Sequence, residues 1–202
     1  MAIDVKKIIV DAFLDLCRSK SLHKISVQDN VDASGVSRQT FYNHFCDKLA
    51  LIQHTYKTRI IFDFDSAESV DMDFCDCCLR SMLKEREYLY FMKPACEITG
   101  PNCLTDYMFW HTAKFDMAYH QYYYGTKELP LLMRKVSEYH SWAAMHMHIQ
   151  WILNGCKESP EDLIAIWIKA RTVSMDELFF DGRQTSPYNI AATKYNVLIG
   201  RE

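Results

Sequence analysis

The spacing of apolar residues constrains the fold of this chain more than any other feature of its sequence. Near the start, apolar residues recur at intervals of three and four, which places them on one side of a helix. They are Val5, Ile8, Ile9, Ala12, Phe13 and Leu16. Similar spacing returns along the chain, and no stretch shows the alternation typical of a strand. With 6 Gly and 5 Pro in 202 residues, the chain is also poor in turn residues. The sequence therefore predicts an all-α protein.

Two helices and a glycine turn are expected first. Asp4 can cap a helix over about residues 4 to 19, and Ser26 can cap a second, shorter one. The second helix should end at Gly35, because glycine readily adopts the left-handed conformation found at helix ends. Its inward positions, by helical spacing, are Val27, Asn30, Val31 and Ser34.

A third, very short helix follows this turn, with Ser37 as its cap and its end near His44. Phe41 and Phe45 lie four residues apart and share a face, so we expect both to pack on the first two helices. Asp47 can cap a fourth helix. A helix, a glycine turn and a second short helix together predict a helix-turn-helix. The remaining side chains of the third helix point outward: Arg38, Gln39, Thr40, Tyr42, Asn43 and His44.

These outward side chains have the chemistry of major-groove recognition. Arginine favours guanine and asparagine or glutamine favours adenine, whereas tyrosine and threonine hydroxyls commonly hold phosphates. Lys48, in the first turn of the fourth helix, is expected to anchor a phosphate. Residues 1–58 hold eight basic and six acidic residues, net +2, and the remainder is net −5, so only the first part suits a polyanion. An ordinary solvated helix face explains the same residue types equally well.

The rest of the chain predicts a second helical domain. The acidic stretch DSAESVDMD, residues 65–73, is typical of a connecting loop. Helical patterns then return, and Pro94 and Gly155 are natural ends for two of them. The sequence SPED at 159–162 combines a serine cap, a proline in the first turn and two acids at the positive end of the helix dipole. The expected helices span residues 74–93, 102–124, 130–154 and 160–180.

A ligand pocket in this domain would take its walls from aromatic and methionine side chains with a few polar ones. That composition predicts an aromatic or lipophilic small-molecule effector with one or two hydrogen-bonding groups. An ordinary core accounts for most of the same residues. The candidate lining residues are Tyr88, Met92, Met108, His111, Phe115, Tyr119, Trp142, Met145 and His146.

The sequence gives little support to catalysis or metal binding. The chain has no HExxH, no glycine-rich phosphate loop and no GxSxG motif, so we do not expect an enzyme. His146 and His148 would point about 200° apart on a helix and could not hold one ion together. The CDCC motif at 75–78 fits small buried residues better than a redox or metal site. We expect no cofactor and no metal.

The sequence also bears on the compartment. No apolar run approaches the ~20 residues of a transmembrane helix, and acids interrupt the apolar positions of the opening MAIDVKKIIVDAF, so no signal peptide is expected. The 8 cysteines are irregularly spaced, which favours reduced thiols over a disulfide framework. We therefore expect a cytoplasmic protein without a membrane partner.

Residues 25–52, ISVQDNVDASGVSRQTFYNHFCDKLALI, resemble the DNA-binding signature of the tetracycline-repressor (TetR) family of bacterial regulators. The shared features are a Ser-Val start, a Gly-Val-Ser turn, a Thr-Phe-Tyr-x-His-Phe recognition helix and a Lys-Leu pair. The resemblance implies an all-helical, homodimeric, ligand-responsive transcription regulator, usually a repressor, that reads a palindromic operator in double-stranded DNA. The residues to which it assigns DNA contacts are Ser37, Arg38, Gln39, Thr40, Tyr42, Asn43, His44 and Lys48.

The same resemblance implies a division of the chain into domains, and it implies a dimer. Its last two helices would pair with their copies, and a ligand would shift the connecting helix. The broad apolar surface of the last helix fits packing inside one subunit as well. The expected interface residues are Trp151, Leu163, Ile166, Trp167, Ala170 and Val173. The expected domains are a helix-turn-helix DNA-binding domain at 1–46, a connecting helix at 47–64, a ligand-binding and dimerisation domain at 74–180, and a C-terminal tail at 181–202.

Two segments, VQDNVDASGVSRQTFYNHF and WILNGCKESPEDLI, are also similar to the branch of the family that contains the dihydroxyacetone-kinase operon regulator. Some members of that branch act as coactivators through a partner protein. The alternative function is therefore a coactivator or adaptor that keeps the fold and works mainly through a protein partner.

Asn30 departs from the resembled family, which usually has Ile or Leu at this inward position of the second helix. A buried amide without a partner costs about 1–3 kcal/mol. Asn30 must therefore find a partner, reach water or weaken the domain, and we expect its replacement by Ile to stabilise the fold.

Overall fold

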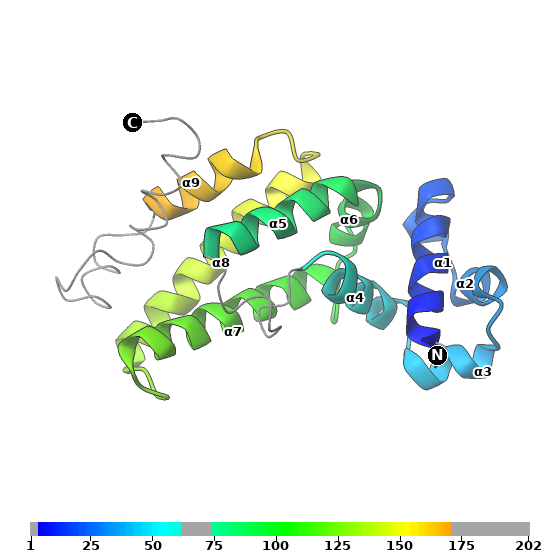
Figure 1. The fold of residues 1–202 in the computed structure, drawn as a ribbon, viewed down its shortest axis with the longest axis horizontal. Coiled ribbons are helices and arrows are strands. Elements are labelled where there is room, and N and C mark those ends of the chain that lie inside the picture. Colours follow the sequence, from blue (N-terminus) through cyan, green and yellow to red (C-terminus); the bar gives the residue numbers. More distant parts are fainter. Residues whose placement is uncertain (1–3, 62–73, 171–202) are drawn as a thin grey trace.

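The computed structural model describes residues 4–61 and 74–170, except for the side chains of Phe74, Tyr119, Tyr122 and Tyr123. Within these ranges the chain forms α-helices and one 3-10 turn, with no strand (Figure 1). The predicted all-α fold class is confirmed. The acidic stretch 65–73 and the tail 181–202 lie outside the described residues. Among the helices that are described, none combines the length and the apolar character needed to cross a bilayer.

Residues 4–45 form a small helical unit at one end of the molecule (Figure 1). Its elements are α1 (Val5–Ser19), the 3-10 turn η1 (Leu22–Lys24), α2 (Val27–Ser34) and α3 (Arg38–His44). The expected caps are present: Asp4, Ser26 and Ser37 each accept a backbone N–H of the helix that follows. Gly35 ends α2 with φ 69°, the left-handed conformation expected of it. The helix-turn-helix geometry is therefore encoded locally.

Helix α4 (Lys48–Arg59) leads from this unit to the remaining helices (Figure 1). Asp47 caps it by accepting the backbone N–H of Ala50 at 2.7 Å. Its predicted inward residues are all buried, namely Leu51, Ile52, Thr55 and Tyr56. One helix thus packs on both parts of the molecule, since α4 also contacts α7.

The single helix expected over residues 74–93 is instead two helices, α5 (Phe74–Glu87) and α6 (Leu89–Cys96). The chain leaves the first helix at Tyr88, and α6 then packs against α1, η1 and α8. Phe91 of α6 meets Phe13 of α1 edge to face, with 6.0 Å between ring centroids. Pro94 lies inside α6 rather than ending it. Packing on α1 decides this path, which the residue pattern of 74–93 alone does not encode.

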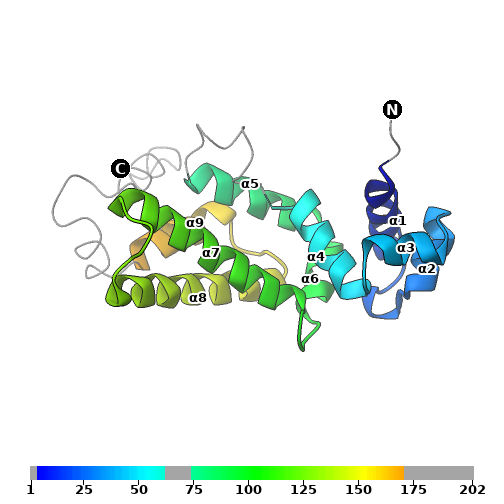
Figure 2. The same cartoon turned by 90° about the horizontal axis from the view of Figure 1, so that it is seen from below.

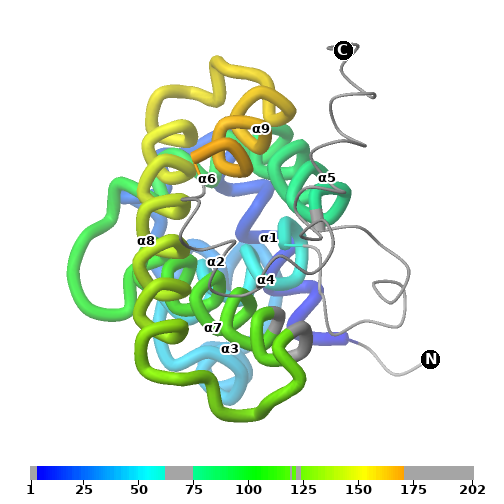
Figure 3. The backbone as a smooth tube through the Cα atoms, turned by 90° about the vertical axis from the view of Figure 1, so that its left-hand side faces the viewer, coloured from blue at the N-terminus to red at the C-terminus, as the bar shows by residue number. Residues whose placement is uncertain are grey.

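The last three helices complete the larger part of the fold. Helices α7 (Leu104–Tyr124) and α8 (Leu131–Leu153) lie side by side as a hairpin, and α9 (Pro160–Ala170) packs against α5 (Figures 1 and 2). The predicted stop of α8 is confirmed by Gly155 at φ 85°, and the predicted cap of α9 by Ser159, whose hydroxyl accepts the N–H of Asp162. Helices α8 and α5 lie on opposite sides of the molecule (Figure 3). The expected continuation of α9 beyond Ala170 falls outside the described residues.

Candidate functional site

The short helix α3 carries two kinds of side chain on opposite faces. Phe41 and Phe45 are 0% and 4% exposed and their ring centroids lie 5.7 Å apart, which confirms the prediction that they are core residues. Phe41 packs in the same buried cluster as the apolar residues of α1 and α4. This internal anchor fixes the orientation of a helix too short to be stable alone.

The opposite face of α3 meets solvent. Arg38 donates from Nη1 to Oε1 of Gln28 on α2 at 3.1 Å, and Gln39 donates from Nε2 to Oδ1 of Asn43 at 3.0 Å. These bonds join exposed groups, so they can be exchanged for bonds to another partner at little cost. The exposed residues of α3 and its cap are Ser37, Arg38, Gln39, Tyr42, Asn43 and His44.

The hydroxyls of Ser37 and Thr40 already take part in hydrogen bonds at the N-terminus of α3. The Ser37 hydroxyl accepts the backbone N–H of Thr40 at 3.0 Å, and the two hydroxyls lie 2.8 Å apart. Thr40 is half-buried. Both residues therefore shape the N-terminus of α3, and their free hydrogen-bonding capacity is smaller than that of Arg38, Gln39 and Asn43.

Lys48 does not extend freely into solvent as a phosphate anchor would. Its Nζ donates to the backbone carbonyls of Ile25 at 2.9 Å and Leu22 at 3.3 Å, at the end of η1. Burial lowers the pKa of this ammonium below its usual value, and the neighbouring Cys17 opposes that shift. Because two of its three donors are engaged by the chain itself, Lys48 ties α4 to the start of the helix-turn-helix.

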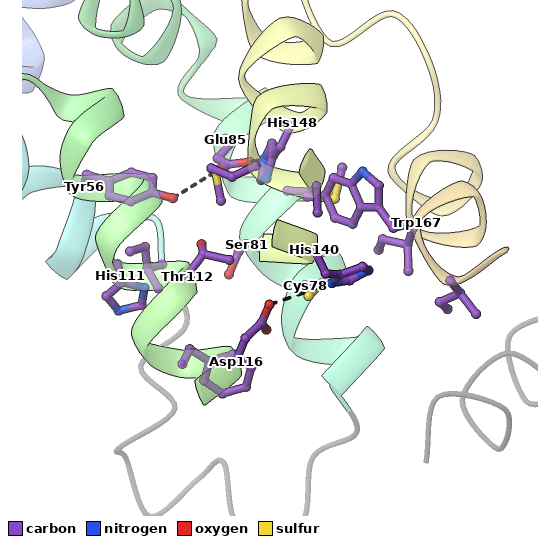
Figure 4. Close-up of a pocket in the computed structure, with 17 residues that line it drawn as sticks. Tyr56, Cys78, Ser81, Glu85, His111, Thr112, Asp116, His140, His148 and Trp167 are labelled. Atoms are coloured by element: carbon purple, nitrogen blue, oxygen red, sulfur yellow. Dashed lines mark hydrogen bonds and ion pairs between the residues drawn. The ribbon is translucent and has the colours of Figure 1, made fainter. Parts of the chain in front are cut away.

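A second candidate site is a cavity of about 110 Å³ in the larger part of the molecule (Figure 4). Helices α4, α5, α7, α8 and α9 all contribute to its walls, which are mainly apolar. The lining residues are Tyr56, Ile61, Cys78, Ser81, Met82, Glu85, His111, Thr112, Phe115, Asp116, His140, Ala144, Met145, His148, Ile164, Trp167 and Ile168.

Only part of the predicted ligand-binding set lines this cavity. His111, Phe115 and Met145 do so. Met92 and Met108 are fully buried core residues elsewhere, and Tyr88 stacks on Tyr90 at the start of α6. Trp142 and His146 face outward on α8, while the side chain of Tyr119 lies outside the described residues. Residue type alone does not distinguish an aromatic or methionine side chain that lines a cavity from one that is packed in the core.

Two buried polar clusters at the cavity wall were not predicted from the sequence. Glu85 of α5 is fully buried, and its carboxylate accepts the Tyr56 hydroxyl at 3.2 Å and contacts His148 Nε2 at 2.5 Å. These three side chains connect α4, α5 and α8 (Figure 4). The available signal was an acid at an inward helical position, four residues after Ser81 and three after Met82, where an apolar residue is the rule.

A second buried carboxylate, Asp116 of α7, lies on another wall. It is 4% exposed and accepts the Ser141 hydroxyl at 2.5 Å, while His140 Nδ1 lies 4.0 Å away. The two carboxylates, when ionised, create a negative electrostatic potential in the cavity wall. Burial raises the pKa of the Cys78 thiol well above its usual value, and Cys75 and Asp116 raise it further; burial and then Glu85 do the same for the Tyr56 phenol.

The expected dimer-interface residues fall into different environments. Trp151 and Leu163 are 3% and 6% exposed inside this one chain, which leaves them almost no surface for a second copy, and Trp167 lines the cavity. Ile166 and Ala170 are exposed, and Val173 lies outside the described residues. The exposed apolar side chains of α8 are others: Leu131, Leu132, Tyr139, Trp142 and Met147.

Comparisons with known proteins agree with this architecture. No protein-family model matches the chain. Over 70 residues it is 39% identical to the HTH-type dhaKLM operon transcriptional activator DhaS of Lactococcus lactis subsp. lactis (strain IL1403); the match covers 35% of this chain and about a third, 34%, of that relative's length. The solved structure of a dihydroxyacetone kinase operon activator DhaS superposes with a TM-score of 0.61 at 21% identity, over 88% of this chain and 99% of that one. The chain shares the fold of that activator.

Proposed function

We propose that this chain is a DNA-binding transcriptional regulator that inserts α3 into the major groove of an operator. The observation that carries the proposal is the exposed polar face of α3, held in place by Phe41 and Phe45 on the opposite side. A short helix fixed in this way after a glycine turn is the element that helix-turn-helix proteins place in the groove. The partial match to an HTH-type transcriptional activator supports the same role.

Each residue type on α3 suits a particular contact. Arg38, Gln39 and Asn43 can exchange their present side-chain partners for base edges, since arginine pairs with guanine and the amides with adenine. Tyr42 and His44, which are both exposed, would hold phosphates beside the groove. Lys48 contributes indirectly, because it fixes the start of α4 against η1.

The cavity offers a route by which a small molecule would regulate DNA binding. Tyr56 belongs to α4, and its hydroxyl bonds Glu85 at the cavity wall. A ligand that enters this cavity and disturbs the Tyr56–Glu85 bond would therefore shift α4, whose other end is bonded through Lys48 to the helix-turn-helix unit. The matched relative is named an activator, whereas the family resemblance implied a repressor, so the proposal covers regulation of transcription in either direction.

The proposed regulator is a homodimer, because two copies of α3 spaced by one turn of DNA would read a palindromic site. The exposed apolar side chains of α8 support an interface on that helix. Large exposed apolar residues gathered on one helix are typical of surfaces that a partner covers.

Binding to DNA from upstream of the coding region, measured by fluorescence anisotropy over a range of salt concentrations, tests the proposal. We expect affinity to fall steeply with salt, and Arg38→Ala to cost about 1–3 kcal/mol. Arg18→Ala, which removes an exposed charge at the C-terminal end of α1, is the matched control and should bind like the wild type. Absence of binding at low salt would overturn the proposal and favour action through a protein partner.

A further inference from the structure

Among the described residues, the side chains that line the cavity include two carboxylates but no permanently positive group. The carboxylates are those of Glu85 and Asp116, which are 0% and 4% exposed. Among the described residues, no lysine or arginine lines the cavity. Two buried acids without a permanent cation disfavour a phosphate or carboxylate ligand and favour a positively charged one.

The two carboxylates differ in how far they are already satisfied. Glu85 contacts Tyr56 at one oxygen and His148 at the other. Asp116 accepts one hydroxyl, from Ser141, and its nearest ionisable neighbour among the described residues is His140, whose Nδ1 lies 4.0 Å away, beyond hydrogen-bond distance. Figure 4 shows Asp116 and His140 pointing toward one another across this end of the cavity. Buried acids are rarely left without a close partner, so Asp116 is the group that a bound cation would complete.

The remaining walls suit an apolar body attached to that cation. Phe115 and Trp167 present aromatic rings, and Met82, Met145 and Ile164 add aliphatic surface. Aromatic faces also attract ammonium groups directly. The volume of about 110 Å³ limits the size of the ligand. For comparison, an engineered apolar cavity of ~150 Å³ binds benzene, so this cavity suits a molecule of about one ring.

We propose that the cavity binds a small apolar amine, with its ammonium group beside Asp116 and its hydrocarbon part against Phe115 and Trp167. The inference specifies the ligand class of the regulatory cavity and in that respect rests on the proposed function. The binding itself requires only the cavity, so it can be measured without DNA.

Calorimetry with three probes of similar size separates the ligand classes. Benzylamine, benzyl alcohol and benzoate carry one ring each and differ in charge. We expect benzylamine to bind roughly tenfold tighter than benzyl alcohol, and benzoate to bind weakest, because a charged hydrogen bond to a buried carboxylate is worth more than a neutral one. Benzoate binding as tightly as benzylamine, or no binding of benzylamine at millimolar concentration, would overturn the proposal.

A substitution at Asp116 tests whether this residue recognises the positive charge of the ligand. Asp116→Asn should lower benzylamine affinity about tenfold and leave benzyl alcohol affinity nearly unchanged, since only the charged contact is lost. Glu87→Gln, which removes an exposed acid of α5 outside the cavity, should leave both affinities unchanged. Equal losses for both probes in Asp116→Asn would contradict the assignment. Should that variant fail to fold, the probe series on the unaltered protein still decides the ligand class.

DNA binding measured with and without benzylamine separates this inference from the proposed function. Amine binding by a protein that binds no DNA supports the inference and refutes the regulator. DNA binding without amine binding refutes the inference and leaves the regulator standing.

Discussion

At the scale of single residues, Lys48 shows how local chemistry depends on neighbours distant in sequence. A lysine in the first turn of a helix suits a phosphate, but Ile25 and Leu22 supply carbonyls to this one. We predict that Lys48→Ala destabilises the chain by about 1–3 kcal/mol, because hydrogen bonds to a charged group are lost. Urea unfolding measures this change. Lys57→Ala, at an exposed position of the same helix, should change stability by less than ~0.5 kcal/mol. Equal effects of the two substitutions would contradict the role given to Lys48.

Of the two polar groups of the Asn30 side chain, only the amide nitrogen has a hydrogen-bond partner among the described residues. Asn30 is 1% exposed, and its Nδ2 donates to the carbonyl of Ile9 at 3.0 Å, while Oδ1 has no partner among the described residues. Replacing it by Ile loses one neutral bond but removes a buried acceptor that costs about 1–3 kcal/mol. We therefore predict that Asn30→Ile stabilises the chain by about 1 kcal/mol, which raises the melting temperature by ~2–4 °C. Asn30→Asp, which buries a charge, should lower the melting temperature. A lower melting temperature for Asn30→Ile would show that the amide is worth more than its unpaired oxygen costs.

At the scale of elements, α2 begins with a capping box in which Ser26 and Asp29 exchange hydrogen bonds. The hydrogen bond from Lys20, followed by those from Ser26, lowers the pKa of the Asp29 carboxyl well below its usual value. A lowered pKa means that this carboxylate stabilises the fold above about pH 4, and that its contribution is lost as pH falls further. We predict a shallower loss of stability in acid for Asp29→Asn than for the wild type, measured by urea unfolding from pH 6 to pH 2. Asp32→Asn, on the same helix, is the control and should follow the wild-type curve.

Helices α4 and α5 are joined by the buried bond between Tyr56 and Glu85. Tyr56→Phe removes the donor and leaves a buried carboxylate oxygen without it, so we predict a loss of about 1–3 kcal/mol in unfolding free energy. Tyr42→Phe, on the exposed face of α3, should change it by less than ~0.5 kcal/mol. A wild-type unfolding curve for Tyr56→Phe would show that the bond contributes nothing to stability.

At the scale of the whole molecule, the proposed dimer uses the outer face of α8. Tyr139 is 74% exposed there, and a charge in the centre of an apolar interface opposes association. We predict that Tyr139→Glu shifts the protein from dimer to monomer in sedimentation equilibrium. Lys84→Glu, on α5 at the opposite side of the molecule, is a matched charge change and should remain dimeric (Figure 3). A dimeric Tyr139→Glu protein would place the interface elsewhere.

Residue type and spacing were enough to predict the helix caps and the glycine turn of the first four helices. Ser26, Gly35 and Ser37 act through bonds and backbone angles within a few residues, so their roles follow from residue type and spacing. Phe41 and Phe45 were equally predictable, because a four-residue spacing fixes a shared helix face whatever the rest of the chain does. The polar face of α3 follows from the same periodicity.

Which residues far apart in sequence meet depends on how the helices pack. The break at Tyr88, the carbonyls that hold Lys48, and the cavity acids Glu85 and Asp116 all depend on packing between helices far apart in sequence. Helical periodicity identifies an inward position but not the neighbour that it faces. Two buried carboxylates therefore look like isolated exceptions in the sequence, and they become part of one cavity only when α5, α7 and α8 pack together (Figure 4).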